Sequence, residues 1–375
     1  MSKLDELIKE YCPDGVEYVQ LKEVCSGHYG KGNKIPEDGG IYPIYGCNGI
    51  VGSTSNYNNE NSPIVGHIGT AGIVVWGEGK HYVTYNGTIC KPLNRNLLSK
   101  YLYHYLKSVD LTKYVKGSQP FLSFSDFAKI KIPLPPIQVQ EEIVRILDTF
   151  IELTAELTAE LTARKKQYEF YSSKLFTNTT SIKVELEKLA KFTYGYTDKA
   201  RDSGNTRFIR ITDIDESGNL ILENKKYIDL NDKAKKSLLK KGDLIMARTG
   251  ATYGKTLYFN SDIQSVYASF LIKITPNKEL LSKYYWHFTK NPLYWEQANK
   301  LVTTGGQPQF NTPSLKQIKI PLPSLAEQQR IIDVLDRFDI LCNDISTGLP
   351  AEIENRKKQY EYCREKLLTF KEKEI

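Results

Sequence analysis

Two stretches of the chain, residues 128–177 and 316–370, are copies of one another, and this duplication limits the folds that the chain can adopt. Within them, the six residues 130–135 (IKIPLP) recur at 318–323. The two copies lie 188 positions apart, far more than the period of about 20 to 50 residues of a solenoid, and the stretch occurs only twice. We therefore predict a duplicated half-protein with pseudo-twofold symmetry.

The second copy is longer than the first inside its helical part. A shared RKKQYE motif starts at Arg164 in the first copy and at Arg356 in the second, and a shared LDxF motif ends at Phe150 and at Phe338. The interval from Phe to Arg is therefore 14 positions in the first copy and 18 in the second, a difference of four. We expect the two spacers to differ there by about one helical turn.

Each copy begins with a proline-rich extended segment and continues into Gln- and Glu-rich sequence that predicts a long helix. In the first copy the helix should run from about Pro136 to Phe176, roughly 40 residues or on the order of 60 Å. Apolar residues at steps of three and four predict that the two helices bury these strips against each other as a coiled coil; the alternative is that each helix packs only on its own globular domain. The strip comprises Ile143, Ile146, Phe150, Leu153, Leu157, Leu161, Tyr168 and Leu175 in the first copy and Ile331, Val334, Phe338, Leu341, Ile345, Leu349, Ile353, Tyr360 and Leu367 in the second.

Two features should interrupt this regularity. The step of four from Leu157 to Leu161 is a stutter, which locally unwinds a supercoil. Gly348 and Pro350 should kink or break the second helix, with Pro350 in the first turn of a new helix.

The rest of the chain forms two blocks that are rich in Gly, Asn, Thr and Tyr and contain short β-like runs. Residues 97–101 (LLSKY) recur at 280–284, and residues 64–69 align with 245–250. We predict an α+β fold with two globular domains separated by two long spacer helices. The predicted segments are an N-terminal helix at 1–15, a first globular domain at 16–132, a first spacer at 133–180, a second globular domain at 181–320 and a second spacer at 321–375.

Composition excludes several classes of protein. The 51 Lys and Arg against 44 Asp and Glu give a net charge of +7, which suits a polyanionic partner and also an ordinary basic protein. The 6 Cys lie far apart, without the spacing of a zinc site or a disulfide framework. No stretch approaches about 18 consecutive apolar residues, so we expect a cytoplasmic protein without a membrane span.

Three short motifs resemble catalytic signatures, and none predicts a reaction centre. Residues 291–294 (NPLY) resemble the methyltransferase motif that holds a flipped adenine, but no glycine-rich cofactor loop precedes them, and an Asn-Pro pair is typical of a helix start. Residues 249–256 (TGATYGKT) lack the first Gly of a phosphate-binding loop, and a strand rather than a helix should follow them. Glu78 and Lys80, far from Asp38, form too loose a pattern for a metal-dependent nuclease.

Two variable blocks, each followed by a near-identical segment with IPLPP or IPLPS, LDxF and RKKQYE, resemble the specificity (S) subunit of type I restriction-modification systems over essentially the whole chain. The resemblance implies that each block is a target recognition domain for one half of a bipartite DNA target. It implies that the two spacers pair antiparallel, fix the distance between the half-sites and dock two methyltransferase (M) subunits. S-adenosylmethionine and adenine methylation would belong to M, and ATP, Mg and cleavage to restriction (R) subunits. This chain would then be non-catalytic, with no cofactor or metal of its own.

The spacer of such a protein would set the gap between the half-sites. Residues 154–157 and 158–161 both read TAEL. Each four-residue unit adds about 6 Å of helix and about 40° beyond a full turn, which is close to the twist of one base pair.

The residues that read DNA should lie in the loops after the shared strands and in the Gln-Pro turns. Arg can pair with guanine and Asn or Gln with adenine, whereas Lys more often contacts phosphate. Arg248 is the strongest candidate. The predicted set is Tyr45, Asn48, His67, Thr70, Ser118, Gln119 and Ser123 in the first block and Arg210, Thr212, Arg248, Thr249, Tyr253, Lys255, Gln307, Gln309 and Asn311 in the second.

Three alternatives stay open at the level of sequence. The recognition subunit of a fused restriction-methylation system of the type IIB kind would look nearly the same. A stand-alone methyltransferase or nuclease with degenerate motifs would transfer methyl groups or cut DNA by itself. A structural coiled-coil adaptor would show no salt-dependent binding to duplex DNA.

Overall fold

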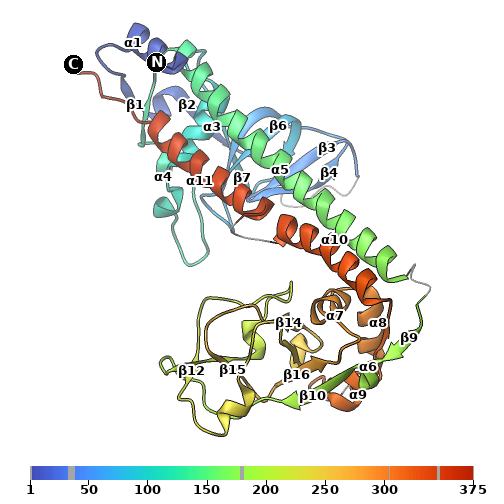
Figure 1. Ribbon diagram of the computed structural model, residues 1–375. Coiled ribbons are helices and arrows are strands. Elements are labelled where there is room, and N and C mark those ends of the chain that lie inside the picture. The colour runs from blue at the N-terminus through green and yellow to red at the C-terminus, as the bar shows by residue number, and fades with distance from the viewer. Residues whose placement is uncertain (1, 33–38, 178–180, 304, 344–346, 375) are drawn as a thin grey trace. The chain divides into compact units, whose positions relative to one another are not determined.

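The computed structural model describes residues 2–32, 39–177, 181–303, 305–343 and 347–374. Its contacts divide the chain into unit 1, Met1–Leu157 with Ile353–Ile375, and unit 2, Thr158–Glu352 (Figure 1). Each unit combines a globular part with segments of the spacer helices, so the five-segment division stays a prediction. Over the described ranges, no helix is both long enough and apolar enough to cross a membrane.

Unit 1 is built on a six-stranded sheet with the strand order β2-β7-β5-β6-β3-β4. Its strands are β2 (Cys25–Tyr29), β3 (Tyr42–Gly46), β4 (Gly49–Thr54), β5 (Asn59–Gly66), β6 (Val74–Val83) and β7 (Gly87–Pro92). The helices are α1 (Lys3–Tyr11), α2 (Leu21–Val24), α3 (Ser99–Ser108), the 3-10 helix η1 (Leu111–Tyr114) and α4 (Phe124–Phe127). A separate antiparallel pair joins β1 (Tyr18–Gln20) to β8 (Lys131–Pro133), directly before α5 (Ile137–Thr177).

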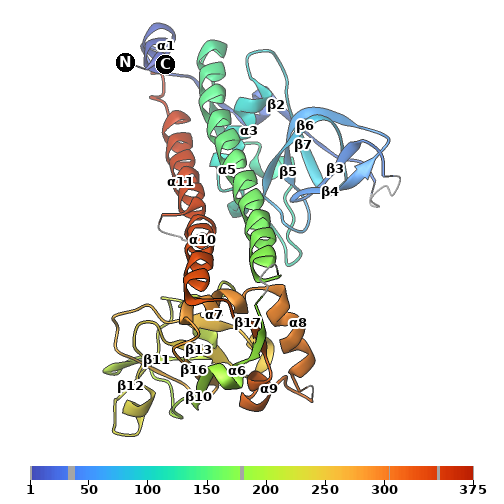
Figure 2. The same cartoon turned by 45° about the vertical axis from the view of Figure 1, so that its right-hand side comes forward.

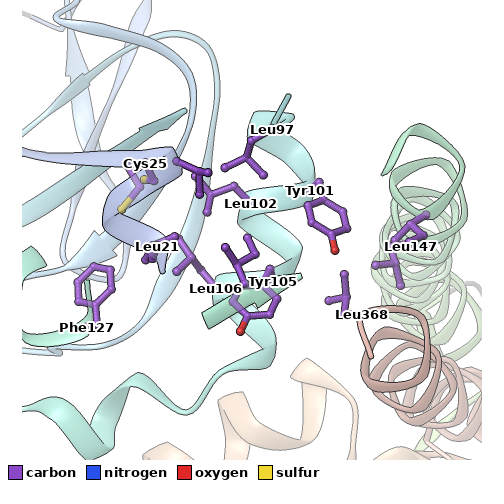
Figure 3. Packing of buried hydrophobic residues seen from close by; sticks show 14 of the residues in the cluster. Leu21, Cys25, Leu97, Tyr101, Leu102, Tyr105, Leu106, Phe127, Leu147 and Leu368 are labelled. Carbon is purple, nitrogen blue, oxygen red and sulfur yellow. The ribbon is translucent and has the colours of Figure 1, made fainter. Parts of the chain in front are cut away.

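The hydrophobic core of unit 1 surrounds α3. Figure 3 shows Tyr101 of α3 facing Leu147 of α5 and Leu368 of the C-terminal segment, while Leu21 and Phe127 lie on the other side of α3. All of these side chains are buried. The first part of α5 therefore packs on the globular part of unit 1 through α3.

Unit 2 has smaller sheets: a four-stranded sheet of order β10-β16-β13-β14, a three-stranded sheet of order β12-β11-β15 and the pair β17-β9. The strands are β9 (Lys183–Glu185), β10 (Ala190–Tyr194), β11 (Thr206–Ile209), β12 (Tyr227–Ile228), β13 (Leu244–Ala247), β14 (Thr256–Tyr258), β15 (Ser265–Tyr267), β16 (Leu271–Pro276) and β17 (Lys319–Pro321). The helices are α6 (Leu186–Leu189), η2 (Ile211–Asp213), η3 (Ala234–Ser237), η4 (Gly250–Thr252), α7 (Ser282–Thr289), α8 (Pro292–Leu301), α9 (Thr312–Lys316) and α10 (Leu325–Asn343).

The first spacer is a single helix of 41 residues, α5, which confirms the predicted run to within one residue at each end. The second spacer consists of α10 and α11 (Leu349–Leu367), of 19 residues each, with the non-helical residues Thr347 and Gly348 before α11. The predicted break at Gly348 and Pro350 is confirmed, and Pro350 lies in the first turn of α11. The expected extra helical turn stays a prediction, because residues 344–346, between α10 and Thr347, lie outside the described residues.

Most of the predicted apolar strip is buried or half-buried within its own unit, although Leu153 is 37% exposed. In unit 1, α5 and α11 lie side by side and run in opposite directions (Figure 2), and Tyr360 joins the same core as Ile143. In unit 2, Tyr168 and Tyr171 of α5 contact Phe338 of α10, with ring centroids 6.4 Å and 5.8 Å apart. Ile345 lies outside the described residues.

The same polar contacts attach α3 to α5 in unit 1 and α7 to α10 in unit 2. Gln140 of α5 accepts from the backbone N–H of Leu98 at 2.9 Å, and Gln328 of α10 accepts from that of Leu281 at the same distance. The Gln140 amide donates to the carbonyls of Asn96 and Pro135, and the Gln328 amide donates to those of Glu279 and Pro323. Each fully buried glutamine thus satisfies three backbone groups at the start of a domain helix.

A histidine–aspartate pair forms the second part of each junction. His104 Nε2 donates to Asp148 Oδ1 at 2.8 Å, and His287 Nε2 donates to Asp336 Oδ1 at 2.8 Å. Burial lowers the pKa of both histidines, against the opposing effect of the carboxylates. His104 Nδ1 also accepts from the Tyr360 hydroxyl at 3.3 Å, whereas His287 Nδ1 is buried without a partner among the described residues.

We expect Gln140→Leu to lower the free energy of unfolding of unit 1 by about 1–3 kcal/mol, because leucine fills the space but leaves three buried backbone groups unpaired. Urea titration and hydrogen exchange at the Leu98 amide measure the effect. The exposed neighbour supplies the control, Glu141→Gln, which should change neither. Unchanged exchange at Leu98 in the Gln140 variant would contradict this account of the junction.

Candidate nucleic-acid interface

In unit 1, β5 ends at Gly66, and the next residue, His67, lies at the centre of an aromatic cluster. The centroid of its ring is 4.1 Å from that of Tyr29, 4.4 Å from that of Phe121 and 5.5 Å from that of Tyr85. His67 is fully buried, whereas Tyr29, Phe121 and Tyr85 are 42%, 37% and 36% exposed. These four residues, the His67 cluster, therefore present aromatic ring surface to solvent above a buried imidazole.

Hydrogen bonding fixes the orientation of the buried ring. His67 Nδ1 lies 2.7 Å from the carbonyl oxygen of Leu122, which can only accept, so Nδ1 carries a proton and donates. Nε2 is buried and has no partner among the described residues. His67 thus supports the rings around it, and any molecule that reaches the cluster meets those rings first.

In unit 2, β13 ends at Ala247, and the next residue, Arg248, is held in a similar way. Its guanidinium carbon lies 5.4 Å from the ring centroids of both Tyr194 and Phe270. Nε donates to the carbonyl oxygen of Ser269 at 3.1 Å, and Nη1 donates to Oδ1 of Asn311 at 2.9 Å. We call Arg248, Tyr194, Phe270, Ser269 and Asn311 the Arg248 cluster.

The two Gln-Pro turns, residues 118–120 and 306–308, lie beside these two clusters. The backbone N–H of Gly69 donates to the Pro120 carbonyl at 3.4 Å, and that of Gly250 donates to the Pro308 carbonyl at 3.0 Å. In unit 1, Ser118 and Gln119 lie in this turn, which leads into Phe121, whose ring contacts His67. In unit 2, Gln309 joins Arg248 through Asn311, whose amide donates to Gln309 Oε1 at 3.1 Å.

The other predicted residues differ in accessibility. In unit 1, Asn48, Thr70, Ser118 and Gln119 are exposed, Ser123 is half-buried, and Tyr45 is buried. In unit 2, Thr212 and Gln307 are exposed, Arg210, Tyr253, Lys255, Gln309 and Asn311 are half-buried, and Thr249 is buried. Arg210 forms a salt bridge with Asp213 at 2.9 Å, and Lys255 forms one with Glu216, so both of these charges already have acidic partners.

The two main motifs that resembled catalytic signatures have structural roles. Asn291 caps α8 by accepting from the Leu293 N–H, and Pro292 begins the helix, which confirms a helix start there. The fully buried Asn291 also donates from its amide to the Ser172 hydroxyl of α5 at 3.0 Å. Residues 249–256 contain the 3-10 helix η4 and lead into the strand β14, as predicted, so no α-helix follows this segment to offer its N-terminus to a phosphate.

The nuclease-like pattern gains no support either. The Glu78 carboxylate accepts from the indole N–H of Trp76, and the Lys80 ammonium lies 4.8 Å from the ring centroid of Tyr57. Asp38 lies outside the described residues. Within the ranges that the structure describes, no group of three or more His, Cys, Asp or Glu side chains could hold a metal ion.

Tyr29, Tyr85 and Phe121 in unit 1 and Tyr194 and Phe270 in unit 2 were not predicted from the sequence. Tyr29 and Tyr194 end the strands β2 and β10, whose sequences CSGHY and AKFTY share only the final tyrosine. A single shared residue in five gives no detectable alignment. Phe121 directly follows the Gln-Pro turn, but the exposure that marks these aromatic residues in the structure has no signal in the sequence.

Comparison with known proteins gives consistent matches. A family model described as the type I restriction modification DNA specificity domain matches residues 13–164 and 178–355. A putative type I restriction enzyme specificity subunit of Haemophilus influenzae is 32% identical over 351 residues, covering 88% of this chain and 89% of that protein. The EcoR124I/EcoR124II specificity subunit of Escherichia coli is 33% identical over 303 residues, covering 74% and 72%.

The fold has solved counterparts as well. The crystal structure of a type I restriction-modification S subunit from M. genitalium superimposes with a TM-score of 0.65 at 17% identity, covering 94% of this chain and 96% of that one. At that identity the likeness shows a shared fold, and the family model and the curated relatives carry the assignment. The chain belongs to the specificity subunits of type I restriction-modification systems, the components that recognise DNA sequence.

Proposed function

We propose that unit 1 and unit 2 each bind one half of a bipartite DNA target. The observation that carries this proposal is the pair of clusters at the same place in two globular parts. Each cluster follows the end of a central strand, lies beside a Gln-Pro turn and contains a tyrosine and a phenylalanine, yet the central side chain is a histidine in one and an arginine in the other. One scaffold used twice with two different surfaces suits a protein that reads two different sequences.

The proposed DNA-contacting set excludes the residues that the fold buries. Tyr45, His67 and Thr249 support the surface from below, at 6%, 0% and 4% exposure. The exposed and half-buried members of the predicted set then form the contact surface, together with Tyr29, Tyr85, Phe121, Tyr194 and Phe270.

We infer that the two spacers form an antiparallel coiled coil in a pseudo-twofold arrangement and that α5 sets the distance between the half-sites. The matching glutamine and histidine–aspartate junctions support a duplicated architecture. The TAEL repeats straddle Leu157 and Thr158, where unit 1 gives way to unit 2 along α5. A change in their number alters the helix between the two units and leaves both clusters untouched.

The spacers also supply two equivalent surfaces for a pair of partner subunits. The residue after each RKKQYE motif is an exposed aromatic, Phe170 at 61% and Tyr362 at 65%. A lysine lies beside each ring, with Lys174 Nζ 5.9 Å from the centroid of Phe170 and Lys366 Nζ 6.0 Å from that of Tyr362. Exposed aromatic side chains flanked by cations are typical interface anchors. We propose that each of these surfaces docks one methyltransferase subunit.

In this proposal the chain itself catalyses nothing and holds no cofactor. S-adenosylmethionine binding and adenine methylation belong to the M subunits, and cleavage with ATP and Mg belongs to the R subunits. The capping role of Asn291 and the strand after residues 249–256 support this division, because both leave the catalytic motifs without the geometry they require.

Deletion of residues 154–157 should shorten the tolerated gap between half-sites by about one base pair, because it removes about 6 Å of helix and about 40° of rotation. Methylome sequencing of a host that expresses the deletion variant with its M subunit measures the gap. Both half-site sequences should stay the same. An unchanged gap would refute the role of α5 as the spacer.

Phe170→Ala and Tyr362→Ala should each remove one of two bound M subunits, and the double variant should remove both, because each ring anchors a separate docking surface. Mass photometry of the purified complex gives the stoichiometry. The neighbouring variants Glu169→Gln and Glu361→Gln are the matched controls and should keep two M subunits. Single variants that retain two M subunits would argue against these anchors.

By itself, the purified chain should transfer no methyl group from labelled S-adenosylmethionine to DNA that contains its target sequence. Addition of the M subunit should produce transfer. Filter binding of the labelled DNA is the measurement. In parallel, duplex binding by the chain should weaken steeply between about 50 and 200 mM salt, as phosphate contacts require. Methyl transfer without M would make the chain an enzyme in its own right.

A further inference from the structure

We propose that the His67 cluster and the Arg248 cluster are equivalent base-reading centres with opposite chemistry. The His67 cluster recognises the C5-methyl group of a thymine in one half-site, and the Arg248 cluster recognises a guanine in the other. The inference rests on the proposed function that each unit binds one half-site, and it names the base feature that each unit reads.

The backbone places the two centres at the same point of the fold. Leu122 N–H donates to the His67 carbonyl at 2.9 Å, and Phe310 N–H donates to the Arg248 carbonyl at 2.8 Å. His67 N–H donates to the carbonyl of Asn86 at 2.8 Å, and Arg248 N–H donates to that of Phe270 at 3.0 Å. Both residues are thus fixed between the same two neighbouring segments.

The first strand of each sheet supplies a second equivalence. Tyr29 and Tyr194 are the last residues of β2 and β10, and each is followed by a glycine whose N–H continues the pairing. Gly30 N–H donates to the Gly87 carbonyl at 2.9 Å, and Gly195 N–H donates to the Leu271 carbonyl at 3.2 Å. A tyrosine ring therefore flanks His67 in one unit and Arg248 in the other.

The His67 cluster offers apolar surface. The His67 ring is buried, and its Nδ1–H donates a hydrogen bond to the Leu122 carbonyl. The accessible groups are the rings of Tyr29, Tyr85 and Phe121, and Phe121 carries no polar atom. Among the features of base edges in the major groove, the thymine methyl group is the one that aromatic side chains recognise by contact.

The Arg248 cluster offers directed donors instead. The hydrogen bonds to Ser269 and Asn311 use Nε and one hydrogen of Nη1, and the two flanking rings restrict the guanidinium plane. Nη2 and the second Nη1 hydrogen make no hydrogen bond among the described residues. Guanine presents two acceptors, O6 and N7, that match such a fork.

Arg248 also keeps its charge available. The structure gives it no salt bridge within the described ranges, in contrast to Arg210 with Asp213. The asparagine that orients it is neutral, so its positive charge remains uncompensated for the electronegative guanine edge. The hydrogen bonds through Nε and Nη1 thus orient the guanidinium group and leave Nη2 available to donate to a base.

The test starts from the methylome of a host that expresses the chain with its M subunit, which gives the two half-sites. Duplexes carrying that target then receive a single change, deoxyuridine for one thymine or 7-deazaguanine for one guanine. Binding by the S and M complex is measured for each. We expect one deoxyuridine in one half-site to weaken binding about fourfold. We expect one 7-deazaguanine in the other half-site to weaken it about tenfold.

Variants assign each effect to its cluster. Phe121→Ala should abolish the penalty for deoxyuridine and leave that for 7-deazaguanine, and Arg248→Gln should do the reverse. Two exposed residues outside the clusters, in Tyr57→Ala and Arg201→Ala, are the matched controls and should leave both penalties intact. The modified duplexes are also tested with the unaltered protein, so the inference can still be decided if a variant fails to fold.

Three results would overturn the inference. The inference fails if no thymine in either half-site is sensitive to loss of its methyl group, or if both penalties vanish together in one variant. Tighter binding to a duplex with an abasic site at the sensitive pair would indicate that the aromatic rings insert between bases. A methylome without any two-part motif would instead overturn the proposed function, so the two failures are distinguishable.

Discussion

The buried glutamine at the start of each spacer helix is the contact on which the rest of the structure depends. A side chain of this length can satisfy an N–H and two carbonyls at once, and Gln140 and Gln328 each do so at a point where a loop, a proline-rich segment and a helix meet. These backbone groups would be costly to bury unpaired. The glutamine therefore fixes where the domain helix begins relative to the spacer.

The division between repeated and divergent sequence follows from this constraint. Junction residues must satisfy the same buried donors and acceptors in both units, so Tyr101 and Tyr284 each donate to the carbonyl of a proline, Pro133 and Pro321. The loops that follow the strands β5 and β13 have no such requirement. His67 and Arg248 can differ because their shared backbone hydrogen bonds do not involve their side chains.

Sequence predicted the elements whose signal is local or repeated. The limits of α5, the interruption before Pro350 and the cap at Asn291 all follow from periodicity, proline and capping preferences. The surface that we propose to read bases was predicted only in part, because a loop residue's exposure depends on segments far away in the chain. His67 is covered by rings from three separate segments, and Tyr29 and Phe121 have no sequence pattern that places them together.

The two spacers differ in continuity: the first is the single helix α5, and the second consists of the two helices α10 and α11. An unbroken helix transmits both length and rotation, so every residue added to α5 changes the phase between its ends. A chain interrupted at Thr347 and Gly348 transmits rotation poorly, because torsion relaxes about the non-helical residues. If α5 sets the target spacing, as we propose, a single insertion in α5 can change that spacing without a compensating insertion elsewhere.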